Sequence, residues 1–82
     1  MWKATRVKAQ PDWKLDVEFA DGTSGIVSIK DSLFGPIFEP LKDPAYFAQV
    51  TIDEFGAVCW PNGADLAPDA LYDRIKSAML VS

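Results

Sequence analysis

The stretch Val58-Cys59-Trp60-Pro61-Asn62-Gly63-Ala64-Asp65-Leu66-Ala67-Pro68-Asp69 decides how the C-terminal part of the chain folds. A strand has to end at Trp60, because the residue before a proline is restricted to extended backbone. Asn62 and Gly63 both tolerate the left-handed backbone of a tight turn, and Pro68 suits the first position of a helix. The stretch therefore predicts a rigid corner between a strand and the last helix.

Upstream of this corner, residues 13–19 show the clearest periodicity in the chain. Apolar and charged residues alternate, which is typical of a half-buried strand: Trp13, Leu15, Val17 and Phe19 against Lys14, Asp16 and Glu18. Asp21-Gly22 is a hairpin signal and leads to a strand over 24–30, with Val27 and Ile29 on one face and Ile26 on the other. A first strand over 2–9, with Trp2, Ala4, Arg6 and Lys8 on one face, completes a three-stranded antiparallel meander.

The middle of the chain predicts short helical turns. Pro36 and Pro40 exclude a long helix, whereas Asp43-Pro44 is a good helix start. The apolar residues of this segment are expected to cover the sheet as a lid: Leu33, Phe34, Ile37, Phe38, Leu41 and Phe47.

The C-terminal third predicts a second hairpin and an amphipathic helix. The hairpin joins 49–53 to 57–60, and the helix spans 69–80 with Leu71, Ile75 and Met79 on its buried stripe. The expected fold class is α+β, in two layers: a small antiparallel sheet of two hairpins or a meander, short helical segments and the C-terminal helix. Residues 1–82 are expected to form one domain.

The charge balance argues against a general nucleic-acid binder. The 82 residues carry 12 acids and 8 bases, a net charge of −4, whereas binding to phosphates requires positive charge. The bases gather at the N-terminus. Residues 1–14 contain one acid, Asp12, and four bases: Lys3, Arg6, Lys8 and Lys14. Lys3, Arg6 and Lys8 are therefore either a solvated strand face or a basic docking edge.

Few catalytic side chains are present. Without histidine the chain has neither a Ser-His-Asp triad nor an imidazole metal ligand, and its single cysteine excludes an internal disulfide. We expect no enzyme activity, no cofactor and no metal. With no apolar signal segment or membrane-spanning run, the chain is expected to be cytoplasmic and away from membranes.

The corner permits two interpretations. In one, it is structural. In the other, Trp60, Asn62, Asp65 and Asp69 converge on a small polar site beside an aromatic wall. Asp65 and Asp69 are four residues apart, so they would share a helix face if the helix began early, and two such carboxylates could hold a hard cation.

Three blocks of the sequence resemble a small bacterial family catalogued as domain of unknown function 2442. They are Phe19-Ala20-Asp21-Gly22, Gly35-Pro36-Ile37-Phe38-Glu39-Pro40-Leu41-Lys42-Asp43-Pro44 and Trp60-Pro61-Asn62-Gly63-Ala64-Asp65-Leu66-Ala67-Pro68-Asp69. The resemblance implies a short α+β protein without an established activity or agreed catalytic residues. Some members carry a helix-turn-helix extension, which does not appear in this sequence. Others are encoded beside a second small protein, an arrangement that resembles toxin–antitoxin pairs.

We therefore expect a non-enzymatic interaction module that binds a partner protein, as the antitoxin-like half of a pair, or a second copy of itself. The alternative is a small-ligand or metal-binding domain that uses the corner from Trp60 to Asp65. A third hypothesis, a nucleic-acid accessory that uses the basic first strand, is disfavoured by the acidic remainder of the chain.

Overall fold

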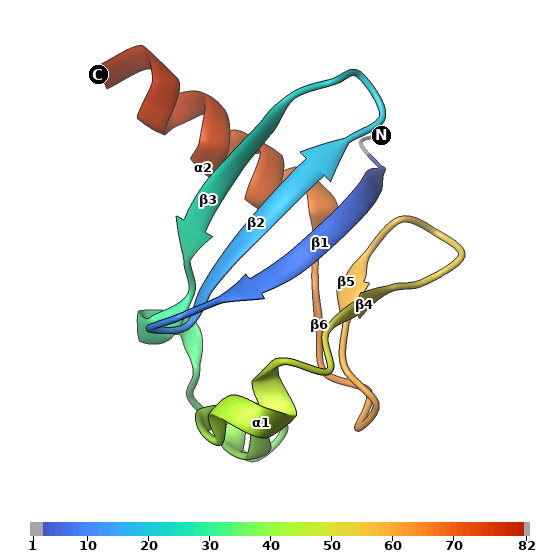
Figure 1. Cartoon of the computed structure of the whole chain (residues 1–82), viewed down its shortest axis with the longest axis vertical. Coiled ribbons are helices and arrows are strands. Elements are labelled where there is room, and N and C mark those ends of the chain that lie inside the picture. Colours follow the sequence, from blue (N-terminus) through green and yellow to red (C-terminus); the bar gives the residue numbers. More distant parts are fainter. Residues whose placement is uncertain (1–2, 82) are drawn as a thin grey trace.

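The central strand of the fold is β2 (Lys14–Phe19), which pairs with antiparallel neighbours on both sides in the computed structural model (Figure 1). Its neighbours are β1 (Ala4–Gln10) and β3 (Ser24–Ser28). The structure describes residues 3–81, and side chains up to Ser77. The predicted α+β class and the three-stranded meander are confirmed.

The alternation along β2 decides which face is buried. Leu15, Val17 and Phe19 are at most 1% exposed, whereas the charged residues between them are on the outer face. At the β2–β3 turn, Gly22 has a φ of +89°, and the Asp21 side chain accepts a hydrogen bond from the Thr23 amide at 2.9 Å. Such a turn stabilises the hairpin locally, as the sequence predicts.

A β-bulge at Thr5 changes the expected faces of β1. Ala4 pairs with Phe19 but Arg6 pairs with Glu18, so the register shifts between them. Ala4 therefore belongs to the inner face, with Val7 and Ala9, and not to the face of Arg6 and Lys8 as strict alternation predicts. Trp2, also predicted on the face of Arg6 and Lys8, lies outside the described residues.

The second sheet consists of three two-residue strands: β4 (Thr51–Ile52), β5 (Val58–Cys59) and β6 (Asp65–Leu66). The existence of β6 corrects the prediction for the corner. The chain leaves β5, turns back through residues 61–63 and pairs again before α2 (Pro68–Val81) begins. Only Gly63, with a φ of +92°, adopts the left-handed backbone; Asn62 does not.

The segment between the sheets contains the 3-10 turns η1 (Lys30–Ser32) and η2 (Glu39–Lys42) and the one-turn helix α1 (Pro44–Phe47). Asp43 caps α1 by accepting a hydrogen bond from the Ala45 amide, as predicted. The lid prediction is only partly right. Leu33, Leu41 and Phe47 are buried and Phe38 is half-buried, but Phe34 and Ile37 are 73% and 46% exposed.

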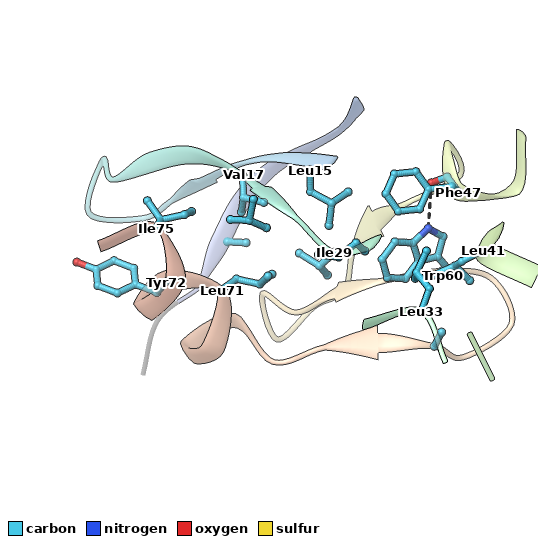
Figure 2. Close-up of a cluster of buried hydrophobic side chains, with 14 of the residues drawn as sticks. Leu15, Val17, Ile29, Leu33, Leu41, Phe47, Trp60, Leu71, Tyr72 and Ile75 are labelled. Carbon is cyan, nitrogen blue, oxygen red and sulfur yellow. Dashed lines mark hydrogen bonds between the residues drawn. The ribbon is translucent and has the colours of Figure 1, made fainter. Parts of the chain in front are cut away.

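Helix α2 lies behind β2 and β3 and closes the inner face of the first sheet (Figure 1). Leu71 and Ile75 are buried there, and Ile75 packs so tightly on Gly25 that a Cβ at this position would lie 2.8 Å from it. The side chain of Met79, the third predicted member of the stripe, lies outside the described residues. One cluster of buried side chains extends from α2 to Trp60 and Phe47 (Figure 2).

Candidate functional site

Trp60 is a core residue. Its side chain is 3% exposed, it stacks on Phe47 with ring centroids 5.7 Å apart, and its indole Nε1 donates a hydrogen bond to the Phe47 carbonyl at 2.9 Å (Figure 2). A buried indole needs a partner for its N–H, and here that partner is backbone. Trp60 therefore presents no aromatic wall to a ligand in solution.

Asn62 joins two distant segments. Its Nδ2 donates to the Ile37 carbonyl at 2.8 Å, while its Oδ1 accepts from the Ala64 amide at 3.1 Å. The second bond shapes the β5–β6 turn, and the first attaches that turn to the loop that follows Leu33. Asn62 thus shapes its own turn with Oδ1 and holds the loop in place with Nδ2.

Asp65 and Asp69 do not share a helix face. Asp65 lies in β6, where it pairs with Cys59, and Asp69 is the second residue of α2. Both residues are exposed. Among the described residues, no group of three or more acidic, cysteine or histidine side chains could hold a metal ion.

Cys59 lies at the centre of the second sheet with its side chain half-buried. Burial raises the pKa of its thiol, and the nearby carboxylates of Asp53 and Asp65 raise it further. Asp53 itself accepts hydrogen bonds from the amides of Phe55 and Ala57, so it shapes the β4–β5 turn. A thiol with a raised pKa is a poor nucleophile at neutral pH.

The candidate basic edge is interleaved with acids. Arg6 donates to Glu18 at 3.0 Å, and Lys8 lies directly opposite Asp16 on the outer face of the meander. Lys3 is exposed at the start of β1, beside Gly56 of the β4–β5 hairpin. The structure thus brings Arg6 and Lys8 together on one face, but opposite charges neutralise them there.

Trp13 departs from the prediction that it is the first residue of the strand over 13–19, because β2 begins at Lys14 and Trp13 lies in the turn before it. It adopts a φ of +55° directly after Asp12 at +65°, which is uncommon for residues other than glycine. Its indole donates to the Leu41 carbonyl at 2.8 Å. Trp13 lines two open cavities, one of about 200 Å³ that Phe47 also lines and one of about 300 Å³ that Leu33 also lines.

The exposed pair Phe34 and Ile37 is a second feature that the sequence did not predict. The two residues flank Gly35-Pro36 in a loop whose ends, Leu33 and Phe38, pack on the core. The only sequence signal for it was the apolar composition of the whole segment, which does not tell exposed from buried positions.

A comparison with protein-family models matches residues 4–77 to the family described as "Protein of unknown function (DUF2442)". The chain belongs to this family. The match includes Arg6 and Lys8 and the whole corner from Trp60 to Asp69, whereas Lys3 precedes it. No protein among the curated sequences matches this DUF2442 chain.

Among solved structures, the chain is similar to a crystal structure from Nitrosomonas europaea of a protein provisionally named as DNA-binding. The TM-score is 0.82 and the sequence identity 30%, over 96% of this chain. The DUF2442 chain spans 52% of the length of that protein. Within the described part of the chain, no helix has the length and apolarity needed to cross a membrane.

Proposed function

We propose that this DUF2442 chain is a non-enzymatic interaction module that binds a partner protein through the loop of residues 33–38. The observation that supports the proposal is the exposure of Phe34 and Ile37 on a backbone that the rest of the fold holds in place. Isolated exposed apolar residues are ordinary on protein surfaces, so the fixed backbone is the important part.

Three contacts fix this loop. Leu33 is buried, Phe38 packs against the core, and Asn62 donates to the Ile37 carbonyl between them. A further hydrogen bond joins the Phe38 amide to the Gly35 carbonyl at 3.2 Å. A loop that is already ordered loses little conformational entropy when it binds, so two apolar side chains can anchor a partner there.

The inventory of side chains also supports a binding role. Burial raises the pKa of the Cys59 thiol, which disfavours its use as a nucleophile. The partner we propose is the second small protein that the family resemblance implies, in an arrangement like that of an antitoxin with its toxin.

The test is co-expression with the product of the neighbouring gene, followed by size-exclusion chromatography. We expect co-elution with the wild-type chain and separate elution with Phe34→Asp or Ile37→Asp. Phe55→Asp is the matched control, because Phe55 is 68% exposed on the β4–β5 hairpin and outside the proposed loop. Independent elution of the two wild-type proteins at micromolar concentration would overturn the proposal.

DNA binding is a second candidate, since the Nitrosomonas protein is provisionally named for it. The outer face of the meander gives it little support, because Glu18 and Asp16 oppose Arg6 and Lys8. Fluorescence anisotropy with a labelled duplex at low salt decides the matter. We expect no binding; an affinity that falls steeply with added salt would establish phosphate contacts instead.

A small-ligand or metal site at Trp60, Asn62 and Asp65 is the remaining alternative, and it has weaker support. Trp60 is buried and both polar atoms of Asn62 are bonded within the protein. A thermal-shift screen with divalent cations and metabolites tests it. A compound that raises the Tm of the wild type but not of Asp65→Ala would favour this alternative over partner binding.

A further inference from the structure

Strand β3 is an edge of the meander, hydrogen-bonded on one side to β2 (Figure 1). Two bonds fix which of its backbone groups face β2: Ile29 N donates to the Trp13 carbonyl at 3.0 Å, and Phe19 N donates to the Thr23 carbonyl at 2.8 Å. Because neighbouring residues of a strand alternate in this respect, the outward N–H and C=O groups belong to Ser24, Ile26 and Ser28.

This edge lacks the usual protection against strand pairing. Edge strands normally carry charged residues, proline or bulges, but Ser24-Gly25-Ile26-Val27-Ser28 contains none of these. Ile26, at its centre, is 60% exposed. Arg74 donates to the Ser28 carbonyl at 2.6 Å and covers one end, although a carbonyl can accept a second hydrogen bond.

We propose that β3 pairs antiparallel with β3 of a second copy of this chain, so that two meanders form one continuous six-stranded sheet. The three residues with outward backbone groups, Ser24, Ile26 and Ser28, are symmetric about Ile26. A two-fold axis there places Ile26 opposite Ile26 of the second copy, and Ser24 opposite its Ser28. Each of these pairs exchanges both backbone hydrogen bonds, and serines that face each other across strands can bond as well.

The symmetric order serine, isoleucine, serine of the outward-bonding residues is the reason to choose a second copy as the occupant. A strand of another protein would need to supply matching residues, whereas a second copy supplies them by symmetry. No like charges meet in this register. The nearest carboxylates on the central row, Asp16 of each copy, are separated by three strand spacings, about 14 Å. That separation exceeds the Debye length of about 8 Å at physiological salt, so their repulsion is largely screened.

The proposed β3 pairing uses other residues than the proposed partner-binding loop of residues 33–38. Either proposal can therefore fail without affecting the other. A five-residue edge is smaller than a standard interface. We therefore expect a reversible dimer in the micromolar range, in equilibrium with monomer.

Sedimentation over a range of protein concentrations tests the proposal. We expect the wild type to pass from monomer to dimer, and Ile26→Lys, which places two ammonium groups opposite each other, to weaken the dimer ~10-fold or more. Ile37→Lys is the matched control, since Ile37 is also exposed but lies in the loop, and it should dimerise like the wild type. A wild type that stays monomeric throughout, or a dimer that Ile37→Lys abolishes and Ile26→Lys does not, overturns the proposal.

Engineered cysteines and a short bis-maleimide cross-linker report the register without relying on affinity. Hydrogen-bonded residues that lie opposite each other have Cα atoms and Cβ atoms about 5.5 Å apart, which is too far for a direct disulfide but within reach of such a cross-linker. In a Cys59→Ser background, Ile26→Cys should cross-link with itself. Ser24→Cys and Ser28→Cys should cross-link with each other when mixed, and not when either is alone. Self-linking of Ser24→Cys, or a lack of linking by Ile26→Cys, would contradict a two-fold axis at Ile26.

Discussion

Replacement of Asn62 tests whether the corner holds the loop of residues 33–38 in place. Asn62→Ala removes two hydrogen bonds, one to the Ile37 carbonyl at 2.8 Å and one from the Ala64 amide at 3.1 Å. Each intramolecular hydrogen bond contributes a net ~1 kcal/mol, so we expect a loss of about 2 kcal/mol in the free energy of unfolding. For a domain of this size that loss lowers the Tm by roughly 8–16 °C.

Asn62→Asp separates the contributions of the two hydrogen bonds to stability. The carboxylate still accepts from the Ala64 amide, but it has no donor for the Ile37 carbonyl and places negative charge beside it. We expect this variant to lose about 1 kcal/mol or more. It should also speed amide exchange in residues 34–38 while it leaves the first sheet unaffected.

Urea unfolding monitored by tryptophan fluorescence measures both variants, with the slope against denaturant as a check that the unfolded state is unchanged. The reasoning is refuted if Asn62→Asp unfolds within about 0.5 kcal/mol of the wild type, the usual scatter of neutral surface substitutions. The bond to Ile37 would then contribute nothing, and the loop would not be pinned by the corner.

Gly56→Ala should lower the free energy of unfolding by at least ~2 kcal/mol, as measured by urea unfolding. Gly56 has a φ of +82°, and a Cβ there would lie 2.8 Å from the Lys3 Cα. If the variant is as stable as the wild type, the β4–β5 hairpin can move away from Lys3. Tyr72 donates to Asp21 at 2.7 Å, which holds the pKa of Asp21 below its ordinary value of 3.8. Because this pKa is lower in the folded state, the stabilisation is present at neutral pH and disappears as the pH falls through the folded value. The stability difference between wild type and Tyr72→Phe should therefore shrink below about pH 3.8, and a difference constant with pH would contradict this assignment. Iodoacetamide should alkylate Cys59 in the native chain at neutral pH more slowly than in urea, since burial raises its pKa, and equal rates would show an accessible thiolate.

Local sequence patterns were sufficient to predict the strands of the first sheet and the start of both α-helices. The alternation along β2, the Asp21-Gly22 turn and the Asp43-Pro44 cap each depend on residues that are neighbours in sequence, and each forms as predicted. The bulge at Thr5 has no such local signal. The bulge is defined by how β1 pairs with β2, where Ala4 lies opposite Phe19 and Arg6 opposite Glu18. Such pairing is a tertiary feature.

The corner shows where local reasoning reaches its limit. Pro61, Gly63 and Pro68 correctly indicate an abrupt turn and a helix start. Strand β6 was missed because two residues carry too little periodicity to be recognised. The lid was only half right for a related reason: Phe34 and Phe38 are equally apolar, and their neighbours in sequence do not tell that Phe38 packs on the core while Phe34 is exposed.

The irregular segment of residues 33–50 explains why this small chain uses large side chains that also donate hydrogen bonds. Apart from single helical turns, the segment lacks regular structure, and buried carbonyl groups need donors. Three side chains from outside it supply them: Trp13, Trp60 and Asn62 donate to the carbonyls of Leu41, Phe47 and Ile37. Each indole buries apolar surface and donates at the same time. Two side chains of the Trp-Pro-Asn-Gly-Ala-Asp corner, Trp60 and Asn62, thus support this segment, and the partner surface that we propose lies on the segment that they support.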